Sequence, residues 1–298
     1  MTPAEQIAQF VASGIVNGAI YALLGLGLVT IHAVTRTVNV AQGEFAAFGA
    51  LLAASVVAAG LPVGLGLVIA VPASAALGWA LYHFGIRPVG TAPPIVLLIV
   101  TIAAHLALKG ILLIGWGTDP YNLPPFTIGE PVRIAQAVVS RQSLWVVGAV
   151  IVVLAVLYLF FTRTLLGRAL RACAVNDTAA RLVGIRVEAM GALAWTLAGA
   201  LGGLAGVLIT PVALATYDMG LLLGLKGFVG AVAAGFVSYP LTVLACVLFG
   251  VVESLGAGLV SSHYRDAIAF GVLIGAMLWR AALALREGVL VSEEAAQE

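Results

Sequence analysis

Long, nearly uninterrupted runs of apolar residues are the feature that most constrains how this chain folds. Each run spans roughly 20 residues, the length an α-helix needs to cross a hydrocarbon core about 30 Å thick. Nine such segments follow one another: 7–31, 38–60, 63–84, 93–116, 142–162, 189–215, 219–237, 240–260 and 267–285. The sequence therefore predicts an all-α, polytopic transmembrane helix bundle.

Two of the nine segments are expected to be short, tilted or broken. Segment 38–60 opens with polar side chains, and segment 219–237 is rich in glycine and contains Lys226. The polar stretch 261–266 divides what would otherwise be one overlong apolar run into two. The predicted number of membrane spans is therefore eight or nine.

Composition excludes several other classes of protein. Apolar residues make up 62% of the chain and charged residues 9%, whereas soluble domains carry about 25% charged residues. The net charge of +1 and the two cysteines exclude a basic nucleic-acid-binding protein and a disulfide scaffold. The apolar runs are continuous rather than alternating over about ten residues, so a transmembrane β-barrel is excluded too.

Basic residues in the loops and near the segment ends predict how the chain is oriented. Cytoplasmic loops carry an excess of Lys and Arg, and loop 163–188 is the most basic. With this loop in the cytoplasm, the basic residues inside are Arg36, Arg87, Arg163, Arg168, Arg171, Arg181, Arg186, Arg280 and Arg286, and those outside are Arg133, Arg141 and Arg265. The N-terminus is therefore expected outside, and the acidic tail 291–298 in the cytoplasm.

The chain has no nucleotide-binding motif of its own. The phosphate-binding pattern G-x-x-x-x-G-K-[ST] needs Ser or Thr after a lysine, but Lys109 and Lys226 are both followed by glycine. The four histidines and two cysteines show no metal-ligand spacing. We therefore expect no enzymatic site, metal or cofactor on this chain, and any ATP that drives it must be bound by another chain.

Five ionisable side chains within the apolar segments are candidates for a functional role: Glu44, His105, Lys109, Lys226 and Glu253. A charge at a helix centre costs roughly 2.5–3.5 kcal/mol on insertion scales, so such groups usually face protein or water. His105 and Lys109 are four residues apart and share one helix face. Structural alternatives exist: Lys109 can extend to the membrane surface, Glu44 can stabilise a helix start, and Glu253 can bond a neighbouring hydroxyl.

Three local predictions concern the shorter segments. Asn39 and Gln42 approximate a capping box for a helix entering at Val40. The outer segment 117–141 is expected to form turns and to resume as a short surface helix at 134–139. Glycines four residues apart let helices approach closely, and packing within the subunit is expected for Gly14/Gly18, Gly199/Gly203, Gly202/Gly206, Gly220/Gly224 and Gly271/Gly275. A dimer face is the alternative for any of these pairs.

Loop 163–188 has the sequence of two short helices. Residues 165–172 are expected to form a helix with basic and apolar sides. An N-cap within 176–178 is expected to precede a second helix that ends at Gly184. Two short helices projecting from the membrane suit docking onto a partner protein. The alternative is a basic anchor that only fixes the topology.

The same loop resembles the coupling loop of ABC importer permeases for branched-chain amino acids. Of the two membrane subunits in that family, it is more similar to the H-type subunit than to the longer M-type subunit. The sequences GRALRA at 167–172 and AARLVGI at 179–185 carry this resemblance. Further matches extend it over nearly the whole chain, at 14–23, 38–45, 197–208, 224–228 and 250–255.

Three departures from the family pattern leave the coupling loop untouched. Gln42 stands where the family usually has His, segment 234–240 replaces a glycine-rich turn, and Ala281 follows Arg280 where a proline is common. Because of these departures, the identity of the transported solute stays open. Relatives import urea, short amides and aromatic acids as well as hydrophobic amino acids.

The resemblance implies one transmembrane permease domain over 1–298 in a bacterial inner membrane, importing a small polar solute, with branched-chain or other hydrophobic amino acids expected first. The implied partners are a second permease (a paralogue or a second copy), two cytoplasmic ATPases that bind ATP and Mg, and a periplasmic substrate-binding protein. ATP-driven closure of the ATPases would move loop 163–188 and rock the spans between inward-open and outward-open states.

The resemblance also implies two sets of functional residues. Those expected to couple the chain to the ATPases are Gly167, Arg168, Arg171, Ala179, Ala180, Arg181 and Gly184. Those expected to line the passage are Asn17, Tyr21, Asn39, Glu44, Lys226 and Glu253. Two other classes stay open: an ion-coupled secondary transporter or channel that uses the intramembrane charges, and a structural membrane scaffold without a transport phenotype.

Overall fold

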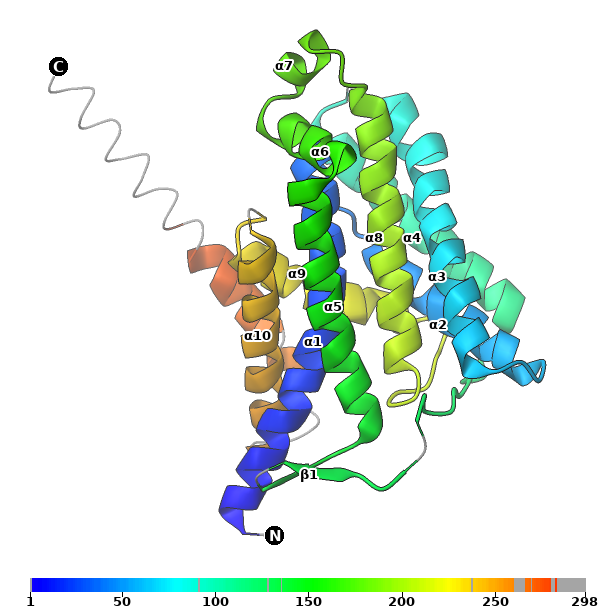
Figure 1. Cartoon of the computed structure of the whole chain (residues 1–298), viewed down its shortest axis with the longest axis vertical. Helices are drawn as coiled ribbons and strands as arrows, with labels where there is room; N and C mark the ends of the chain where they lie inside the picture. The colour runs from blue at the N-terminus through cyan, green and yellow to red at the C-terminus, as the bar shows by residue number, and fades with distance from the viewer. Residues whose placement is uncertain are drawn as a thin grey trace, which may run out of the picture.

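The computed structural model describes residues 2–90, 92–127, 129–134, 136–236, 238–259, 266–268, 270–279 and 282. Its elements are α1 (Pro3–Thr35), α2 (Gln42–Ala58), α3 (Val63–Ala80), η1 (Leu81–Ile86), η2 (Arg87–Val89), α4 (Pro94–Trp116), β1 (Val132–Ile134), β2 (Ala137–Val139), α5 (Arg141–Arg163), α6 (Leu165–Val175), α7 (Asp177–Leu182), α8 (Val187–Ile209), α9 (Met219–Ala233) and α10 (Tyr239–Leu259). The chain is a bundle of long apolar helices, as predicted (Figure 1).

Within the described residues, six helices are long and apolar enough to cross a membrane: Pro3–Thr35, Val63–Val89, Pro94–Trp116, Arg141–Arg163, Val187–Ile209 and Tyr239–Leu259. Three shorter apolar helices are Gln42–Ala58, Met219–Ala233 and Asp266–Trp279. These nine helices correspond to the nine predicted segments. Residues 261–265 of the polar stretch 261–266 and the tail 291–298 lie outside the described residues, as do Arg280, Ala281 and Arg286.

The two segments expected to be short are the helices α2 and α9. They contain 17 and 15 residues, and at 1.5 Å per residue they extend about 26 Å and about 23 Å, less than the hydrocarbon thickness. α2 also begins inside the bundle, because the side chain of its first residue, Gln42, donates to the carbonyl of Ala198 in the middle of α8 (3.0 Å). The expectation of two incomplete spans is confirmed.

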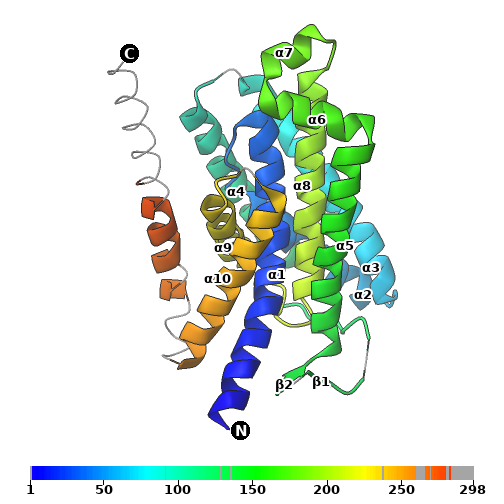
Figure 2. The ribbon, with the colours of Figure 1, turned by 60° about the vertical axis from the view of Figure 1, so that its left-hand side comes forward.

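Helix α1 runs through the centre of the bundle, where α8, α9 and α10 pack around it (Figures 1 and 2). Its N-terminal end lies beside the β1–β2 hairpin, because the Gln9 side chain donates to the carbonyl of Val138 (3.0 Å) and accepts from its N–H (2.8 Å). Helices α6 and α7 lie at the other end of the bundle. The N-terminus and loop 163–188 are therefore at opposite ends, as the alternation of spans predicts.

Glycines bring helix backbones into contact within the subunit, as expected. A Cβ added to Gly14 would lie 2.5 Å from Cα of Val251, and one added to Gly18 would lie 2.6 Å from Cα of Val247. The pairs Gly199/Gly203, Gly202/Gly206 and Gly220/Gly224 likewise face α3 or α2. Gly271 and Gly275 differ, because a Cβ on either meets nothing within 4 Å among the described residues.

Two local predictions are wrong. The surface helix at 134–139 is instead part of an antiparallel hairpin in which Val132 pairs with Val139; its valines favour a strand, and Gln9 satisfies the edge. The helix expected from Val40 begins at Gln42. Asn39 Oδ1 accepts from the N–H of Ala41 (3.1 Å), which holds the residues before α2 in a turn. The Asn39 side chain therefore does not cap the helix, and no capping box forms.

Candidate functional site

The segment after α5 forms the two predicted short helices, α6 and α7; the N-cap of α7 lies within the predicted residues 176–178, and α6 has an N-cap that was not predicted. Thr164 accepts from the N–H of Gly167 (2.9 Å), and Asn176 accepts from the N–H of Ala179 (2.9 Å). α7 ends in a Schellman motif at Gly184, whose φ is +85°. Its two bonds run from the N–H of Gly184 to the Arg181 carbonyl and from the N–H of Ile185 to the Ala180 carbonyl, 3.0 Å each.

Helix α6 packs on the C-terminal end of α5. Gly167 lies where a Cβ would overlap the carbonyl oxygen of Phe160. Arg171 donates through Nη2 to the carbonyl of Phe161, and Leu170 and Cys173 are buried. Gly167 and Arg171 from the predicted coupling set therefore hold the loop in place, and so do buried Ala180 and the turn residue Gly184.

The opposite side of the two helices is a surface that is both apolar and basic. We define the α6–α7 surface by its exposed side chains: Leu165, Leu166, Arg168, Val175, Ala179, Arg181, Leu182 and Val183. Val175 and Leu182 are 85% and 84% exposed. Large apolar side chains this exposed, interleaved with arginine, are typical of a protein-interaction site.

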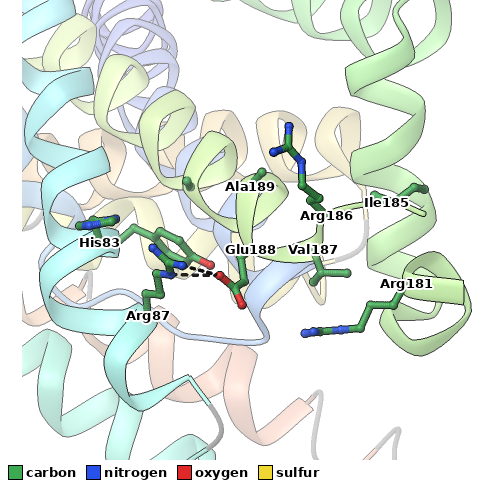
Figure 3. A pocket seen from close by; sticks show the side chains of 10 residues that line it. His83, Arg87, Arg181, Ile185, Arg186, Val187, Glu188 and Ala189 are labelled. Atoms are coloured by element: carbon green, nitrogen blue, oxygen red, sulfur yellow. Dashed lines mark hydrogen bonds and ion pairs between the residues drawn. The ribbon is translucent and has the colours of Figure 1, made fainter. Parts of the chain in front are cut away.

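Behind α7, a cavity of about 490 Å³ separates this helix from η1, η2 and α8 (Figure 3). Arg87 of η2 forms an ion pair with Glu188 of α8 there, with Nη2 2.8 Å from Oε2. Arg181 extends from α7 toward this pair, whereas Arg186 points away from it. The pair is about half exposed, so it contributes at most about 1 kcal/mol.

The basic residues of three separate loops meet at this end of the bundle. Arg36, which follows α1, donates through Nη2 to the carbonyl of Ala174 in α6 (2.7 Å). Arg87 and Arg181 line the cavity behind α7 from opposite sides. Arg36, Arg87 and loop 163–188 therefore share one end, as the distribution of basic residues predicts.

We expect Gly167→Ala to weaken the attachment of α6, because the new methyl group would overlap backbone atoms of α5. The cost is about 1–3 kcal/mol, as for other overpacked sites. Gly148→Ala, also on α5, is the matched control, because a Cβ there meets nothing within 4 Å. Thermal unfolding of the purified protein and protease cleavage of loop 163–188 measure the effect. Equal stability of the two variants would contradict this role of Gly167.

A first buried group of charges, the Lys226 cluster, joins α1, α9 and α10. Lys226 Nζ donates to Oε1 of Glu253 (2.7 Å) and lies 3.1 Å from Oδ1 of Asp266. It also lies 5.8 Å from the ring centroid of Tyr21. The Glu253 side chain is fully buried. Three predicted passage residues are thus brought together, and half-buried Asn17 precedes Tyr21 by one turn of α1.

Asp266 is a member of the Lys226 cluster that the sequence did not predict. In the sequence it belongs to the polar stretch that divides two spans, where a carboxylate is unremarkable. Only the packing of Asp266–Trp279 near α9 reveals that its carboxylate reaches Lys226.

A second buried group, the Glu44 cluster, joins α2 and α4. Nδ1 of His105 lies at hydrogen-bond distance from Oε1 of Glu44 (2.9 Å), and both side chains are buried. Asn39 Nδ2 donates to Oε1 of Gln42 (3.4 Å). Asn39 and Glu44 are therefore not part of the Lys226 cluster. His105 was absent from the predicted passage set, although its spacing from Lys109 was a usable signal.

Helix α9 connects the two clusters. Its first turn touches Glu44, because a Cβ added to Gly220 would overlap the carboxylate, and its middle carries Lys226. Among the described residues, no group of three or more His, Cys, Asp or Glu side chains is arranged to hold a metal ion.

Comparison with known proteins identifies similar transport permeases. A family model described as "Branched-chain amino acid transport system / permease component" matches residues 10–277. The high-affinity branched-chain amino acid transport system permease protein LivH of Escherichia coli (strain K12) is 26% identical over 293 residues, covering 92% of this chain and 94% of LivH.

Two further relatives differ in how much they cover. The corresponding permease protein BraD of Pseudomonas aeruginosa is 28% identical over 287 residues, covering 91% of this chain and 93% of BraD. The ribose import permease protein RbsC of Escherichia coli (strain K12) is 27% identical over 206 residues, covering 64% of this chain and 57% of RbsC. The family match spans most of the membrane helices, and the chain belongs to the family of branched-chain amino acid transport system permease components.

Proposed function

We propose that this chain is the membrane-spanning permease subunit of an ATP-driven importer for branched-chain or other hydrophobic amino acids. The observation that carries the proposal is the α6–α7 surface, which combines exposed apolar and basic side chains at one end of a transmembrane bundle. The printed function of the relatives, branched-chain amino acid transport, supports the choice of solute.

The attachment of α6 and α7 supports a route for coupling. α6 packs on the end of α5 through Gly167 and Arg171, and α7 continues into α8 through the turn at Gly184. A force applied to the α6–α7 surface by two closing ATPase subunits would therefore reach α5 and α8 directly. The cavity behind α7 leaves room for this movement.

The same arrangement supports an orientation in a bacterial inner membrane. Arg36, Arg87 and five arginines of loop 163–188 share one end of the bundle, and such an excess favours the cytoplasmic side. The N-terminus and the β1–β2 hairpin then face the periplasm, where a substrate-binding protein delivers the solute. A second permease, as a paralogue or a second copy, completes the passage.

The Lys226 cluster is suited to a passage that opens and closes. Its ammonium group has two carboxylate acceptors, one buried in α10 and one half exposed on Asp266. A cation with two acceptors can change its partner without ever being left unpaired, which keeps the cost of movement low. We therefore place this cluster, with Asn17, beside the route of the solute.

Affinity purification from the native membrane in a gentle detergent, with mass spectrometry of the bound proteins, tests the proposal. We expect two ATPase subunits and a second permease to co-purify, and uptake of leucine to stop when ATP is depleted. Repeated recovery of the chain alone, with uptake that persists while the proton gradient holds, would instead identify an ion-coupled transporter. A deletion strain with normal uptake of every solute tested would indicate a scaffold.

The solute is tested separately in the same strain. Competition of leucine uptake by isoleucine and valine, but not by urea, short amides or aromatic acids, is the expected pattern. If only one of these other solutes competes, the chain is still an importer subunit, but the transported solute is different from the one proposed.

A further inference from the structure

The polar side chains of α4 lie in a single line along an otherwise apolar helix. Thr101, His105 and Lys109 are spaced four residues apart and so share one face. Thr101 bonds the chain just before α2, accepting from the N–H of Val40 (3.3 Å) and donating to the carbonyl of Val38 (3.1 Å). The line of polar side chains therefore faces α2, and we call this contact the α4 seam.

Glu44 presents an open acceptor in this seam. Its Oε1 lies against His105, whereas its Oε2 is buried and has no hydrogen-bond partner among the described residues. Burying a carboxylate oxygen without a hydrogen-bond donor is energetically unfavourable. A protein can keep such an unpaired oxygen when a bound ligand supplies the missing hydrogen-bond donor during function.

Lys109 presents an open donor one helical turn farther along the seam. Its Nζ lies 5.7 Å from the ring centroid of Tyr217, and in the described part of the chain it forms no ion pair. One turn of α-helix corresponds to about 5.4 Å. His105, which contacts Glu44, and Lys109 are thus about one turn apart on α4, so a carboxylate and an ammonium group lie along the same stretch of the seam.

Apolar side chains surround the Lys109 end of the seam. Phe48 of α2, Leu112 and Trp116 of α4, and Tyr217 pack in one hydrophobic cluster there. Trp116 lies at the end of α4 near Tyr121, on the same side of the bundle as the loop before the hairpin. The seam therefore offers two opposite charges and an apolar wall together.

We propose that the α4 seam binds a zwitterionic α-amino acid with an aliphatic side chain. Oε2 of Glu44 accepts from its ammonium group, Nζ of Lys109 donates to its carboxylate, and the cluster around Phe48 and Trp116 contacts its side chain. The inference rests on the proposed import function and adds to it the groups that recognise the solute. It also assigns a role to His105, which orients the Glu44 carboxylate.

Access to this site requires α4 to move away from α2. α4 can do so because most of its surface is exposed in the subunit and its polar contacts to the chain around α2 come from Thr101 and His105. Two charges placed in a site of low dielectric attract a zwitterion strongly. Molecules that carry only one of the two charges bind less favourably, because one buried protein charge would stay unpaired.

Substrate protection of an introduced cysteine tests the site directly. Thr216→Cys places a reporter next to Tyr217, and the two native cysteines are buried; burial also raises the pKa of the Cys173 thiol and makes it less reactive. The complex is labelled with a maleimide in native membranes. The protectants are leucine, 3-methylbutylamine (which lacks the carboxylate) and 4-methylpentanoate (which lacks the ammonium group).

We expect leucine alone to protect the reporter in the otherwise unchanged protein. Loss of a charge-assisted bond weakens binding about tenfold or more, so Glu44→Gln and Lys109→Met should each lower the apparent affinity for leucine by this factor. Glu44→Gln should then let 4-methylpentanoate protect as well as leucine. Lys109→Met should do the same for 3-methylbutylamine.

Conservative and distant variants act as controls. Lys109→Arg should keep protection by leucine, and Leu106→Ala, on the exposed side of α4, should leave it unchanged. Equal protection by leucine in all variants, or no change of preference between the two analogues, would overturn the inference. The labelling reaction needs no ATP, so it tests the binding site independently of the ATPases. If leucine protects a chain that co-purifies with no ATPase, the proposed binding site stands and the proposed importer function is refuted.

Discussion

Reversing the charge of Arg168 and Arg181 together is expected to release the ATPase subunits and abolish uptake. Both side chains are exposed on the α6–α7 surface. Replacing one partner of an interfacial charge pair costs about 2 kcal/mol or more. Two such contacts correspond to a roughly thousandfold loss of affinity. Co-purification of the ATPases with the Arg168→Glu/Arg181→Glu variant measures this loss, and uptake of leucine gives the functional result.

The matched control reverses two arginines at the other end of the bundle. Arg133 and Arg141 are exposed beside the β1–β2 hairpin, and Arg133→Glu/Arg141→Glu should retain the ATPases. Membrane levels of both variants are compared to exclude a folding defect. An intact, active complex in the Arg168→Glu/Arg181→Glu variant would refute the docking surface.

Glu253→Gln should reduce uptake about tenfold or more while the complex still assembles. The substitution keeps the shape of the side chain but removes a charge-assisted bond to Lys226, which contributes about 1.5–3 kcal/mol. The subunit stays folded because Lys226 keeps the Asp266 carboxylate and the Tyr21 ring. Initial rates of uptake and the yield of purified complex separate the two effects.

Asp266→Asn is the companion variant, because it removes the half-exposed acceptor of the same lysine. We expect a smaller loss of uptake from it, since exposed ion pairs contribute at most about 1 kcal/mol. Normal uptake by Glu253→Gln would mean that this carboxylate only stabilises the bundle. Loss of the whole complex would lead to the same conclusion.

Helices and their interruptions could be predicted from the sequence because their signals are local. Apolar runs set the spans, and the polar start of 38–60 and the glycines of 219–237 reveal the two short helices. Thr164, Asn176 and Gly184 begin and end α6 and α7 by contacts within a few residues.

Partners that are distant in the sequence could not be predicted from such local signals. Glu44 and His105 are 61 residues apart, and nothing near either residue reveals that they meet. The β1–β2 hairpin was missed for a related reason, because Gln9, which bonds the edge of the hairpin at Val138, is 129 residues away in the sequence. The predicted coupling residues also divide only in the structure, where Gly167 and Arg171 attach the loop and Arg168 and Arg181 remain on its surface.

The close contact between α1 and α10 has a consequence for how this chain is made. Gly14 and Gly18 lie in the first helix to leave the ribosome, whereas Val247 and Val251 belong to one of the last. α1 must therefore wait in the membrane with its glycine face uncovered until nearly the whole chain has been synthesised. A chain terminated before α10 would lack the main neighbour of its central helix, so quality-control proteases of the membrane should remove it.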